Sequence, residues 1–538
     1  MSKPGHYFLL ALLLVLIFSL RMLVSIFAHP LRIGWDPALH LQCAELITMG
    51  KIPYVDMFDV NPPLIWYLDT IPAYFSKVWQ VPQTLTFNLF LVGLMAVSAL
   101  LSSFVIFRRL PANEIKDREL LYLGLICGLL FFNFHLRYDF GQREEIFVLF
   151  YFPYLLLRYA RYLGARFNGT EAALIGVFGS IGICLKHYFV LVAFFVELVL
   201  FIALRRRGET KSVLLSPENI ACLVFALLYA GHFLLAPPAM YDNYFHFLIP
   251  AFAKGYQFWD TCLANSLGAC DKRGVFFLLC AGSALSLLVM PRYKVLLPLT
   301  VFSLLSVIPY LMQFKGWNYH DIPVFAGACI LLTCLGGIVV DRLGKLPIKD
   351  LQPVMPILTV CLIAGYSLVN ALDEINQTRA ERQFDLARLG FSTIFGLNLS
   401  SPYSDIDSPF TETLLKYAKA KDNVLFISNG VSPGYPLLTQ LALSPTSRHL
   451  HCCILSVLAF IKDTQRPTAE VKKLLAREPE VIAQYAEDIK KNRPPLIYIQ
   501  VAPVSAYLEQ YKFVETHMKD YAKLGEAANF YVYKRADL

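Results

Sequence analysis

The sequence predicts an α-helical polytopic membrane protein with a C-terminal α/β soluble domain. Of its 538 residues, 56% are hydrophobic and only 16% are charged, a composition that is rare among soluble globular proteins. The hydrophobic residues are contiguous, and a bilayer-spanning helix needs about 20 predominantly apolar residues in a row. Beyond residue 371 the composition becomes mixed, which predicts a membrane domain at 1–371 and a separate domain at 372–538.

Eleven stretches of the membrane domain are interpreted as spanning helices. The first is interpreted as a helix rather than a removable signal peptide, because no small-residue cleavage site follows it. The predicted spans are 7–27, 84–107, 119–134, 146–162, 171–185, 188–204, 220–236, 275–290, 295–312, 322–340 and 355–371.

The distribution of Lys and Arg predicts the orientation, since short cytoplasmic loops carry the excess of these residues. The basic segments are 108–118, 158–166, 205–211, 292–294 and 342–349. The connections between them then face outward, at 28–82, 135–145, 186–187, 237–273 and 313–321. The N-terminus is therefore expected in the cytoplasm and the C-terminal domain outside. This topology also accounts for the net charge of +8, so nucleic acid is not implied as a partner.

The C-terminal region alternates between extended and helical patterns. Residues 423–428, 496–500 and 530–534 are predicted strands, and residues 469–477 and 481–491 are predicted helices. The Gly/Pro-rich segment 428–436 follows a strand but lacks phosphate-loop spacing, so it is interpreted as an ordinary turn. In the outward regions, Cys262 and Cys270 are the pair suited to a disulfide.

Acidic residues gather in the first outward connection. Trp35 and Asp36 come soon after the first span, and Asp56 and Asp59 lie in the segment PYVDMFDVNPPL. The second outward connection, GQREE, adds more acids and an arginine close to the bilayer. Taken singly, each of these acids is best interpreted as a solvated loop residue. Their recurrence in successive outward connections favours a functional site.

Cations and aromatic residues continue this pattern in the later outward connections. Lys186 and His187 form a short turn, and the segment QFKGWNYHDIP follows further along the chain. Such a set is suited to hold a phosphate on cations beside a sugar stacked on aromatic rings. The alternative is that the cations snorkel to lipid headgroups and that the aromatics belong to an interfacial belt. An arginine near the outer end of the first span, Arg21, fits the cationic set, because a charge there needs a partner or must snorkel.

Taken together, PYVDMFDVNPPL, GQRE and KGWNYHDIP resemble the GT-C membrane glycosyltransferases. The chain is most similar to the bacterial branch related to protein O-mannosyltransferases, aminoarabinose transferases and Rgt-type galacturonosyltransferases. The resemblance covers the membrane half well and the soluble half only in general layout. It implies transfer of a sugar from a polyprenyl-phosphate donor, usually with inversion, to an acceptor on the outer side of the membrane.

The resemblance also implies roles for individual residues. Asp36 is the expected general base, which takes the proton of an acceptor hydroxyl. Many relatives have Glu directly after this Asp, where this chain has Pro37, and Asp56 or Asp59 is expected as a residue that shares the role. Glu144 fits the second acidic position, where it orients the acceptor or the Arg143 side chain.

The resemblance implies that the donor phosphate is held by residues from three outward connections. The expected phosphate ligands are Arg143, Lys186, His187, Lys315 and His320, and the expected sugar or acceptor contacts are Trp35, Trp317 and Tyr319. Metal dependence is left open, because acids near a phosphate either hold a divalent ion or work without one.

The expected partners are membrane lipids, the polyprenyl-phosphate sugar donor, and a glycan, lipid or protein acceptor. The amphipathic stretches 64–79 and 241–259 are predicted to lie on the membrane and roof the site. The resemblance places the protein in a bacterial inner membrane with the C-terminal domain in the periplasm.

Two other functions fit part of the pattern. A transporter or lipid flippase also has many spans, although carriers usually show repeated halves and polar residues at the membrane midplane. A noncatalytic scaffold whose outer domain binds a partner is the third possibility.

Overall fold

In the computed structural model, the described residues are 4–205, 213–256, 274–344, 354–391, 399–451 and 453–538. The chain forms two compact units. The first unit comprises Met1–Ser25, Leu89–Gly231 and Cys262–Asn376, and the second comprises Ile26–Asn88, His232–Thr261 and Gln377–Leu538. The C-terminal region therefore packs in one unit with two earlier segments of the chain. The disulfide predicted for Cys262 and Cys270 lies outside the described residues.

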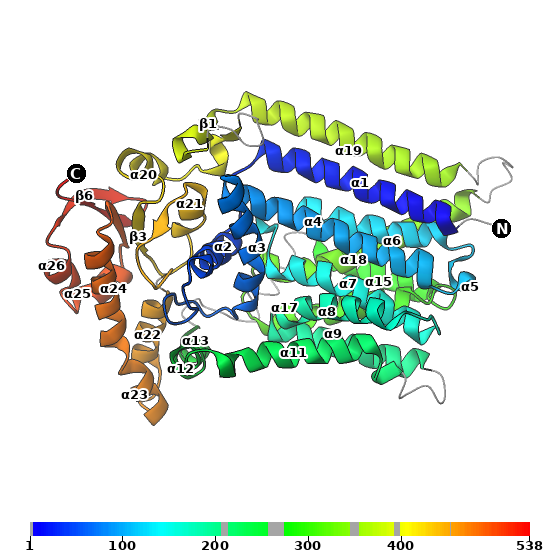
Figure 1. Ribbon diagram of the computed structural model, residues 1–538, viewed down its shortest axis with the longest axis horizontal. Coiled ribbons are helices and arrows are strands. Elements are labelled where there is room, and N and C mark those ends of the chain that lie inside the picture. Colours follow the sequence, from blue (N-terminus) through cyan, green and yellow to red (C-terminus); the bar gives the residue numbers. More distant parts are fainter. Residues whose placement is uncertain (1–3, 206–212, 257–273, 345–353, 392–398, 452) are drawn as a thin grey trace. The chain divides into compact units, whose positions relative to one another are not determined.

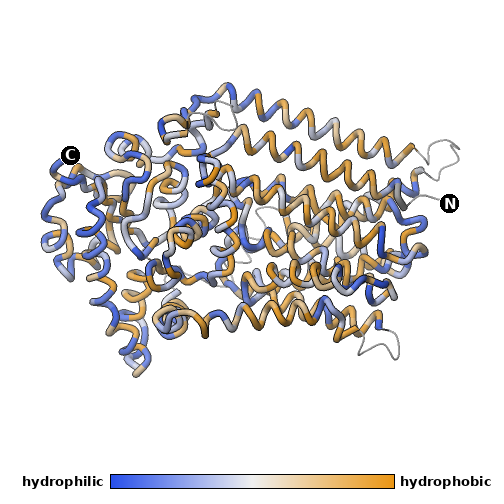
Figure 2. The backbone as a smooth tube through the Cα atoms, viewed as in Figure 1, coloured by the Kyte–Doolittle hydropathy of each residue, from blue (hydrophilic) through white to orange (hydrophobic). Residues whose placement is uncertain are grey.

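The first unit consists of helices that lie side by side (Figure 1) and are largely hydrophobic along their length (Figure 2). Its helices, some of which continue into the second unit, are α1 (Pro4–Ala28), α4 (Gln83–Phe104), η1 (Val105–Arg109), α5 (Ala112–Ile115), α6 (Glu119–Phe131), η2 (Phe132–His135), η3 (Arg137–Asp139), α7 (Arg143–Tyr162), α8 (Gly169–Cys184), α9 (His187–Leu204), α11 (Pro217–Leu235), α15 (Val275–Val289), α16 (Leu296–Leu305), α17 (Val307–Met312), η6 (Asn318–Asp321), α18 (Ile322–Gly344) and α19 (Met355–Ala380).

Each of the eleven predicted spans coincides with helical structure. Six helices in the described chain are long and apolar enough to cross a membrane: His6–Ala28, Gln83–Arg109, His187–Leu204, Pro217–Leu235, Asn318–Gly344 and Met355–Ala380. Shorter apolar helices cover four more of the predicted spans, at Glu119–His135, Gly169–Cys184, Val275–Val289 and Leu296–Met312. The structure thus supports a membrane protein, and the number of eleven spans stays a prediction.

Small residues bring α6 and α18 into close contact. A Cβ atom on Gly124 would lie 2.3 Å from the Thr333 carbonyl oxygen, and one on Gly128 would lie 2.3 Å from the Thr333 Oγ1. Both glycines belong to the sequence GLICG, a GxxxG spacing that lets two helix backbones approach each other in membranes. This contact holds α18 against α6.

An ion pair joins α1 to α19. The Arg21 guanidinium lies 2.7 Å from one carboxylate oxygen of Glu374. The other oxygen accepts a hydrogen bond from the Ser25 hydroxyl at 2.8 Å. The charge that the sequence placed in the first span is therefore matched by a carboxylate.

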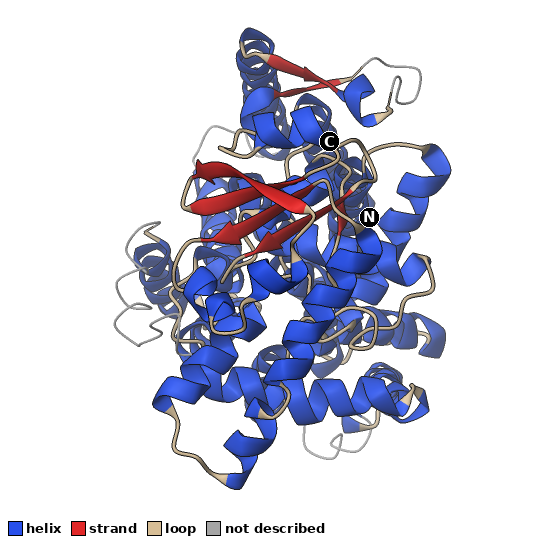
Figure 3. Cartoon of the chain, turned by 90° about the vertical axis from the view of Figure 1, so that its left-hand side faces the viewer, coloured by secondary structure: helices blue, strands red, loops and turns tan. Residues whose placement is uncertain are grey.

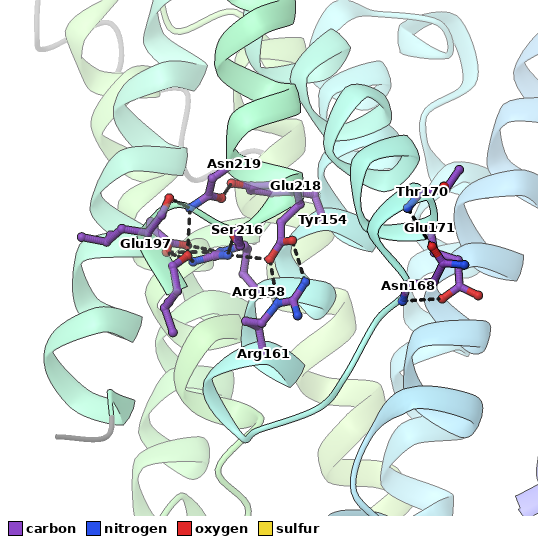
Figure 4. Close-up of polar contacts among 12 residues, drawn as sticks. Tyr154, Arg158, Arg161, Asn168, Thr170, Glu171, Glu197, Ser216, Glu218 and Asn219 are labelled. Atoms are coloured by element: carbon purple, nitrogen blue, oxygen red, sulfur yellow. Dashed lines mark hydrogen bonds and ion pairs between the residues drawn. The ribbon is translucent and has the colours of Figure 1, made fainter. Parts of the chain in front are cut away.

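A network of charged side chains is buried at the C-terminal end of α7 (Figure 4). Arg158 is 1% exposed and lies 2.6 Å from Glu197 of α9 and 2.7 Å from Glu218 of α11. Arg161 lies 2.8 Å from the second oxygen of Glu218, and Arg158 also donates to the Ser216 hydroxyl at 2.8 Å. Every charge in this network has a partner, which is the condition for burying ionised groups among apolar helices. The basic pattern of the sequence did not indicate these carboxylate partners.

The second unit contains the sheet and a group of helices from earlier in the chain. The earlier segments form α2 (Trp35–Thr48), α3 (Leu64–Trp79), α12 (Pro238–Tyr241), η4 (Asp242–Leu248) and α13 (Ile249–Gly255). The C-terminal segment forms β1 (Gln383–Asp385), η7 (Leu386–Leu389), β2 (Ser400–Pro402), η8 (Tyr403–Asp405), α20 (Thr411–Tyr417), β3 (Asn423–Ile427), α21 (Gly434–Gln440), β4 (Ser444–Pro445), α22 (Cys453–Thr464), α23 (Ala469–Leu475), α24 (Glu478–Asn492), β5 (Leu496–Gln500), α25 (Val504–Glu509), α26 (Phe513–His517), β6 (Tyr521–Ala527) and β7 (Phe530–Arg535).

Five strands form a mixed sheet in the order β4-β3-β5-β7-β6 (Figure 3). Strand β3 pairs in parallel with β4 and β5, and β7 pairs antiparallel with β5 and β6. The predicted strands at 423–428, 496–500 and 530–534 are confirmed as β3, β5 and β7, and the two predicted helices are α23 and α24. Strand β6 was missed because it is an edge strand with mostly exposed residues, so no alternating pattern marks it.

The Gly/Pro-rich segment after β3 is closely packed. The space beside it, lined by Ser428, Gly430 and His449 among others, has a volume of about 10 Å³. That volume is about the size of a single water molecule, so the segment forms no open ligand site.

The burial of the Arg158 network predicts that removing its ion pairs destabilises the protein far more than removing an exposed ion pair does. Arg158→Ala leaves Glu197 and Glu218 without their main partner, and breaking such a buried pair costs about 3–5 kcal/mol. We expect a marked fall in the thermal unfolding midpoint of the purified protein. Arg109→Ala is the control, because Arg109 and its partner Glu171 are about one third exposed and such pairs contribute about 0–1 kcal/mol. Equal shifts in the two variants would contradict the role of burial.

Candidate active site

The sequence Gly-Gln-Arg-Glu-Glu places polar side chains at the start of α7. Arg143, Glu144 and Glu145 form the first helical turn and are buried. Glu145 accepts a hydrogen bond from the Gly141 backbone N–H at 2.5 Å. Acidic residues in a first turn are stabilised by the positive end of the helix dipole. The burial of three charged residues in a row is unusual, because ionised groups are expensive to remove from water.

An ion pair connects the start of α7 to the start of α9. The Lys186 ammonium lies 2.5 Å from a carboxylate oxygen of Glu144, and the two side chains are 9% and 2% exposed. Lys186 is the residue before α9, whose first turn contains no acidic residue and no side-chain cap. The positive end of that helix therefore adds to the charge of Lys186.

The segment before α18 supplies a third set of side chains. The Tyr319 ring lies 5.7 Å from the Lys186 ammonium, and the Trp317 ring lies 4.5 Å from the Lys315 ammonium. His320 is 3% exposed, stacks against Trp317 with ring centroids 5.5 Å apart, and lies within the electrostatic influence of Lys186 and Lys315. Three of the expected phosphate ligands, Lys186, Lys315 and His320, thus lie beside the Trp317 and Tyr319 rings.

Several buried hydrogen-bonding atoms at this place have no partner among the described residues. Within the described residues, these atoms include Gln142 Oε1, Arg143 Nε, Glu144 Oε2 and Glu145 Oε1, four successive positions of the chain. His320 Nδ1 also lacks a partner among the described residues. Folded proteins leave few such atoms, because an unmade buried hydrogen bond is costly. The set combines a cationic N–H donor with carboxylate and amide acceptors, which suits a ligand that carries both negative charge and hydroxyl groups.

His187 lies at the edge of this cluster. Its side chain is exposed and its ring contacts Tyr188, with centroids 3.8 Å apart. Arg143 and Lys186 are nevertheless close enough to influence it electrostatically.

In the second unit, the segment PYVDMFDVNPPL is fixed by its aromatic residues. Tyr54 is fully buried between Tyr244, at a centroid distance of 4.3 Å, and Trp66, at 5.3 Å. Its carbonyl oxygen accepts a hydrogen bond from the Asn243 amide at 2.7 Å. The Phe58 N–H donates to a carbonyl of the segment before α22 at 2.7 Å. These contacts hold the segment in one conformation.

Asp59 is buried at the centre of this arrangement. Its carboxylate lies 3.0 Å from His451 Nε2 and accepts hydrogen bonds from the Asn61 amide and the Val60 N–H, both at 2.7 Å. Burial opposes ionisation, but the hydrogen bond and charge of His451 outweigh it and lower the pKa of Asp59 to about 2. Burial likewise opposes the charge on His451, but Cys453 and Asp59 raise its pKa well above 6.5. The pair is therefore ionised at neutral pH.

The other acids of the second unit have different surroundings. Asp56 accepts the Ile52 N–H at 2.8 Å and lies 3.9 Å from the Lys51 ammonium, so it stabilises a turn. Asp36 lies in the first turn of α2 and is partly exposed, and the neighbouring Trp35 side chain is 61% exposed.

Asp69 of α3 was not singled out from the sequence. It is 1% exposed, and neither carboxylate oxygen has a hydrogen-bond partner among the described residues. Burial raises its pKa well above 3.8. An isolated acid on an amphipathic helix gives no sequence signal of this kind. His451 was missed for a similar reason, because it lies 392 residues from its partner.

The structure brings one part of the predicted site together within the first unit. That group consists of Arg143, Glu144, Lys186, Lys315, Trp317, Tyr319 and His320, with His187 at its edge. The three predicted aspartates, Asp36, Asp56 and Asp59, belong to the second unit, as does Trp35. Among the described residues, no three His, Cys, Asp or Glu side chains are arranged to hold a metal ion.

No protein-family model and no curated protein matches this chain.

The charges of Asp59 and His451 predict a bell-shaped dependence of stability on pH. The Asp59 contribution is present above about pH 4 and is lost as the pH falls through the lowered pKa. The His451 contribution is complete below pH 6.5 and is lost as the pH rises through the raised pKa. The stability difference between wild type and the double variant Asp59→Asn/His451→Gln should therefore be largest between about pH 4 and 6.5. Thermal unfolding at a series of pH values measures it, and a difference independent of pH would contradict the ionised pair.

Proposed function

We propose that this protein is an integral-membrane glycosyltransferase that moves a sugar from a polyprenyl-phosphate donor to an acceptor hydroxyl. One observation carries the proposal: four successive buried residues at the start of α7 have unused hydrogen-bonding atoms. Their mixture of donor and acceptors matches a sugar phosphate, whose phosphate is anionic and whose sugar hydroxyls donate hydrogen bonds. The motif resemblance to the GT-C glycosyltransferases points to the same donor.

The cations of the first unit are suited to stabilise the leaving group. When the bond between the anomeric carbon and the phosphate oxygen breaks, negative charge develops on the phosphate. Arg143, Lys186 and Lys315 lie within electrostatic reach of His320, where this charge would be held. The Glu144 carboxylate fixes the Lys186 ammonium in advance, so its orientation requires little rearrangement during the reaction.

Asp36 is the best candidate for the general base. Asp59 accepts three hydrogen bonds and has a pKa of about 2, which makes it a weak proton acceptor. Asp56 accepts a hydrogen bond from the Ile52 N–H and so stabilises a turn. Asp36 stands partly exposed in the first turn of α2, next to an exposed aromatic ring that is suited to contact a sugar or an acceptor.

The proposed reaction is a single displacement. Asp36 takes the proton from the acceptor hydroxyl as that oxygen bonds to the anomeric carbon from the face opposite the phosphate. The bond between the anomeric carbon and the phosphate oxygen breaks, and its electron pair leaves with the polyprenyl phosphate. The products are the glycosylated acceptor and polyprenyl phosphate, and the proton passes from Asp36 to water. The acceptor is a glycan, a lipid or a protein.

Helix α3 supports a position at the membrane surface. It is amphipathic, and its exposed side chains include Tyr74, Phe75, Val78 and Trp79. Such a helix lies in a membrane interface with its apolar face toward lipid. The isoprenoid tail of the donor would remain in the bilayer. The proposed location is a bacterial inner membrane, with the N-terminus in the cytoplasm and the donor site facing the periplasm.

Removing the Lys186 charge should weaken donor binding. For Lys186→Met we expect at least about a tenfold loss of affinity for a radiolabelled polyprenyl-phosphate sugar, because a charge-assisted hydrogen bond contributes about 1.5–3 kcal/mol. Arg137→Met is the matched control, since Arg137 is an exposed cation of the same outward connection as Arg143. Equal affinities of the Lys186→Met protein and wild type would contradict the phosphate site.

Asp36→Asn should separate binding from chemistry. Loss of the base should lower turnover by about 10²–10⁴-fold while donor affinity stays near that of wild type. The measurement is sugar transfer by purified protein with a panel of polyprenyl-phosphate sugars, with Asp56→Asn as the control that retains activity. Full turnover in Asp36→Asn would contradict its role as base. Donor binding without turnover by wild-type protein for every donor and acceptor tested would favour a transporter or flippase.

A further inference from the structure

A cavity of about 630 Å³ lies in the second unit, in the C-terminal region of the chain. Its volume is within the range of about 300–1,000 Å³ that is typical of pockets for small organic molecules. A lone phosphate ion would therefore fill only a small part of the cavity. The lining residues come from the start of β1 to η7, from η8, from α20 and from β6: Arg382, Arg388, Tyr403, Glu412, Thr413, Leu415, Lys416, Tyr417 and Leu524.

The lining carries an excess of positive charge. Arg382, Arg388 and Lys416 face a single lining carboxylate, that of Glu412. Within the described residues, none of the three cations forms an ion pair. Lys534 of β7 adds a further cation near the cavity, 5.4 Å from the centre of the Tyr417 ring. A cavity of this charge attracts anionic groups.

Aromatic rings hold two of these cations in place. The Arg382 guanidinium lies 4.3 Å from the centre of the Tyr403 ring, and the Lys416 ammonium lies 5.0 Å from that of Tyr417. The Tyr403 hydroxyl donates a hydrogen bond to Glu412 at 2.9 Å. Such contacts restrict long side chains before a ligand arrives, which reduces the entropy lost on binding.

We propose that this cavity binds an acidic saccharide, a sugar chain that carries phosphate or carboxylate groups. The three cations would bind the anionic groups, while the Glu412 carboxylate and the Thr413 hydroxyl would accept hydrogen bonds from sugar hydroxyls. A lipid surface fits less well, because only Leu415 and Leu524 supply aliphatic side chains to the lining. The proposal concerns a binding site separate from the donor site and does not require the proposed transferase activity.

Equilibrium binding to the full-length protein in nanodiscs of neutral lipid tests the proposal. The probes are a phosphorylated maltotriose and a trisaccharide of uronic acids, with neutral maltotriose, inorganic phosphate and short-chain phosphatidic acid for comparison. At least one acidic trisaccharide should bind at least tenfold more tightly than the neutral one and than either phosphate probe. Added salt should weaken that binding.

The double variant Arg382→Gln/Arg388→Gln should lose at least tenfold in affinity for the acidic trisaccharide. Lys419→Gln/Lys490→Gln is the matched control, because it removes two exposed cations of the same unit that do not line the cavity. Unfolding midpoints equal to that of wild type would show that both variants fold. Lys186→Met should leave this binding unchanged, so a failure of the donor-site proposal is distinguishable from a failure here.

Three results would overturn the proposal. The first is the absence of binding by both acidic trisaccharides. The second is equal affinity in the Arg382→Gln/Arg388→Gln variant and wild type. The third is phosphatidic acid or inorganic phosphate binding as tightly as the acidic trisaccharides, which would assign the cavity to a lipid headgroup or a simple anion.

Discussion

The ion pair between Glu144 and Lys186 links the elements of the proposed donor site to one another. It joins the first turn of α7 to the start of α9, and Lys186 in turn faces the Tyr319 ring ahead of α18. A buried charge of either sign would be costly alone, so each residue of the pair depends on the other. Because the pair uses only one Glu144 oxygen, the second oxygen and the neighbouring Arg143 Nε keep unused hydrogen-bonding capacity. The pair thus holds these charged side chains in position and leaves hydrogen-bonding atoms of Glu144 and Arg143 free to bind a ligand.

The other buried charges of the protein show the difference between a structural and a ligand-binding arrangement. Arg158 contacts two carboxylates and a hydroxyl, and Asp59 contacts His451, Asn61 and a backbone N–H. Arg158 lies in α7 as well, about 21 Å along the helix from Glu144. One helix therefore carries a satisfied network at its C-terminal end and an unsatisfied one at its N-terminal end. This contrast is the physical basis for assigning ligand binding to the N-terminal end.

Local patterns were predictable from the sequence, whereas partners distant in the chain were not. Continuous apolar stretches predicted helices, because spanning helices are encoded within about 20 residues. The buried strands β3, β5 and β7 were predicted because each is a short run of apolar residues in the sequence. Strand β6, whose residues are mostly exposed, has no such run and was not predicted. The sequence also singled out Glu144 and Lys186 separately, although their pairing across 42 positions could not be predicted from it. The packing of residues 26–88 with the C-terminal region depends on contacts such as Asp59 with His451, which no local pattern encodes.

The proposed reaction requires a phosphate to be bound where α7, α9 and α18 begin. The most direct measurement is a cryo-electron microscopy structure of the protein in nanodiscs with a short-chain polyprenyl phosphate. We predict phosphate density within hydrogen-bond distance of Arg143 and Lys186, with the isoprenoid chain extending into lipid. Phosphate density elsewhere, with the Arg143 and Glu144 side chains hydrogen-bonded to other groups of the protein, would contradict the account.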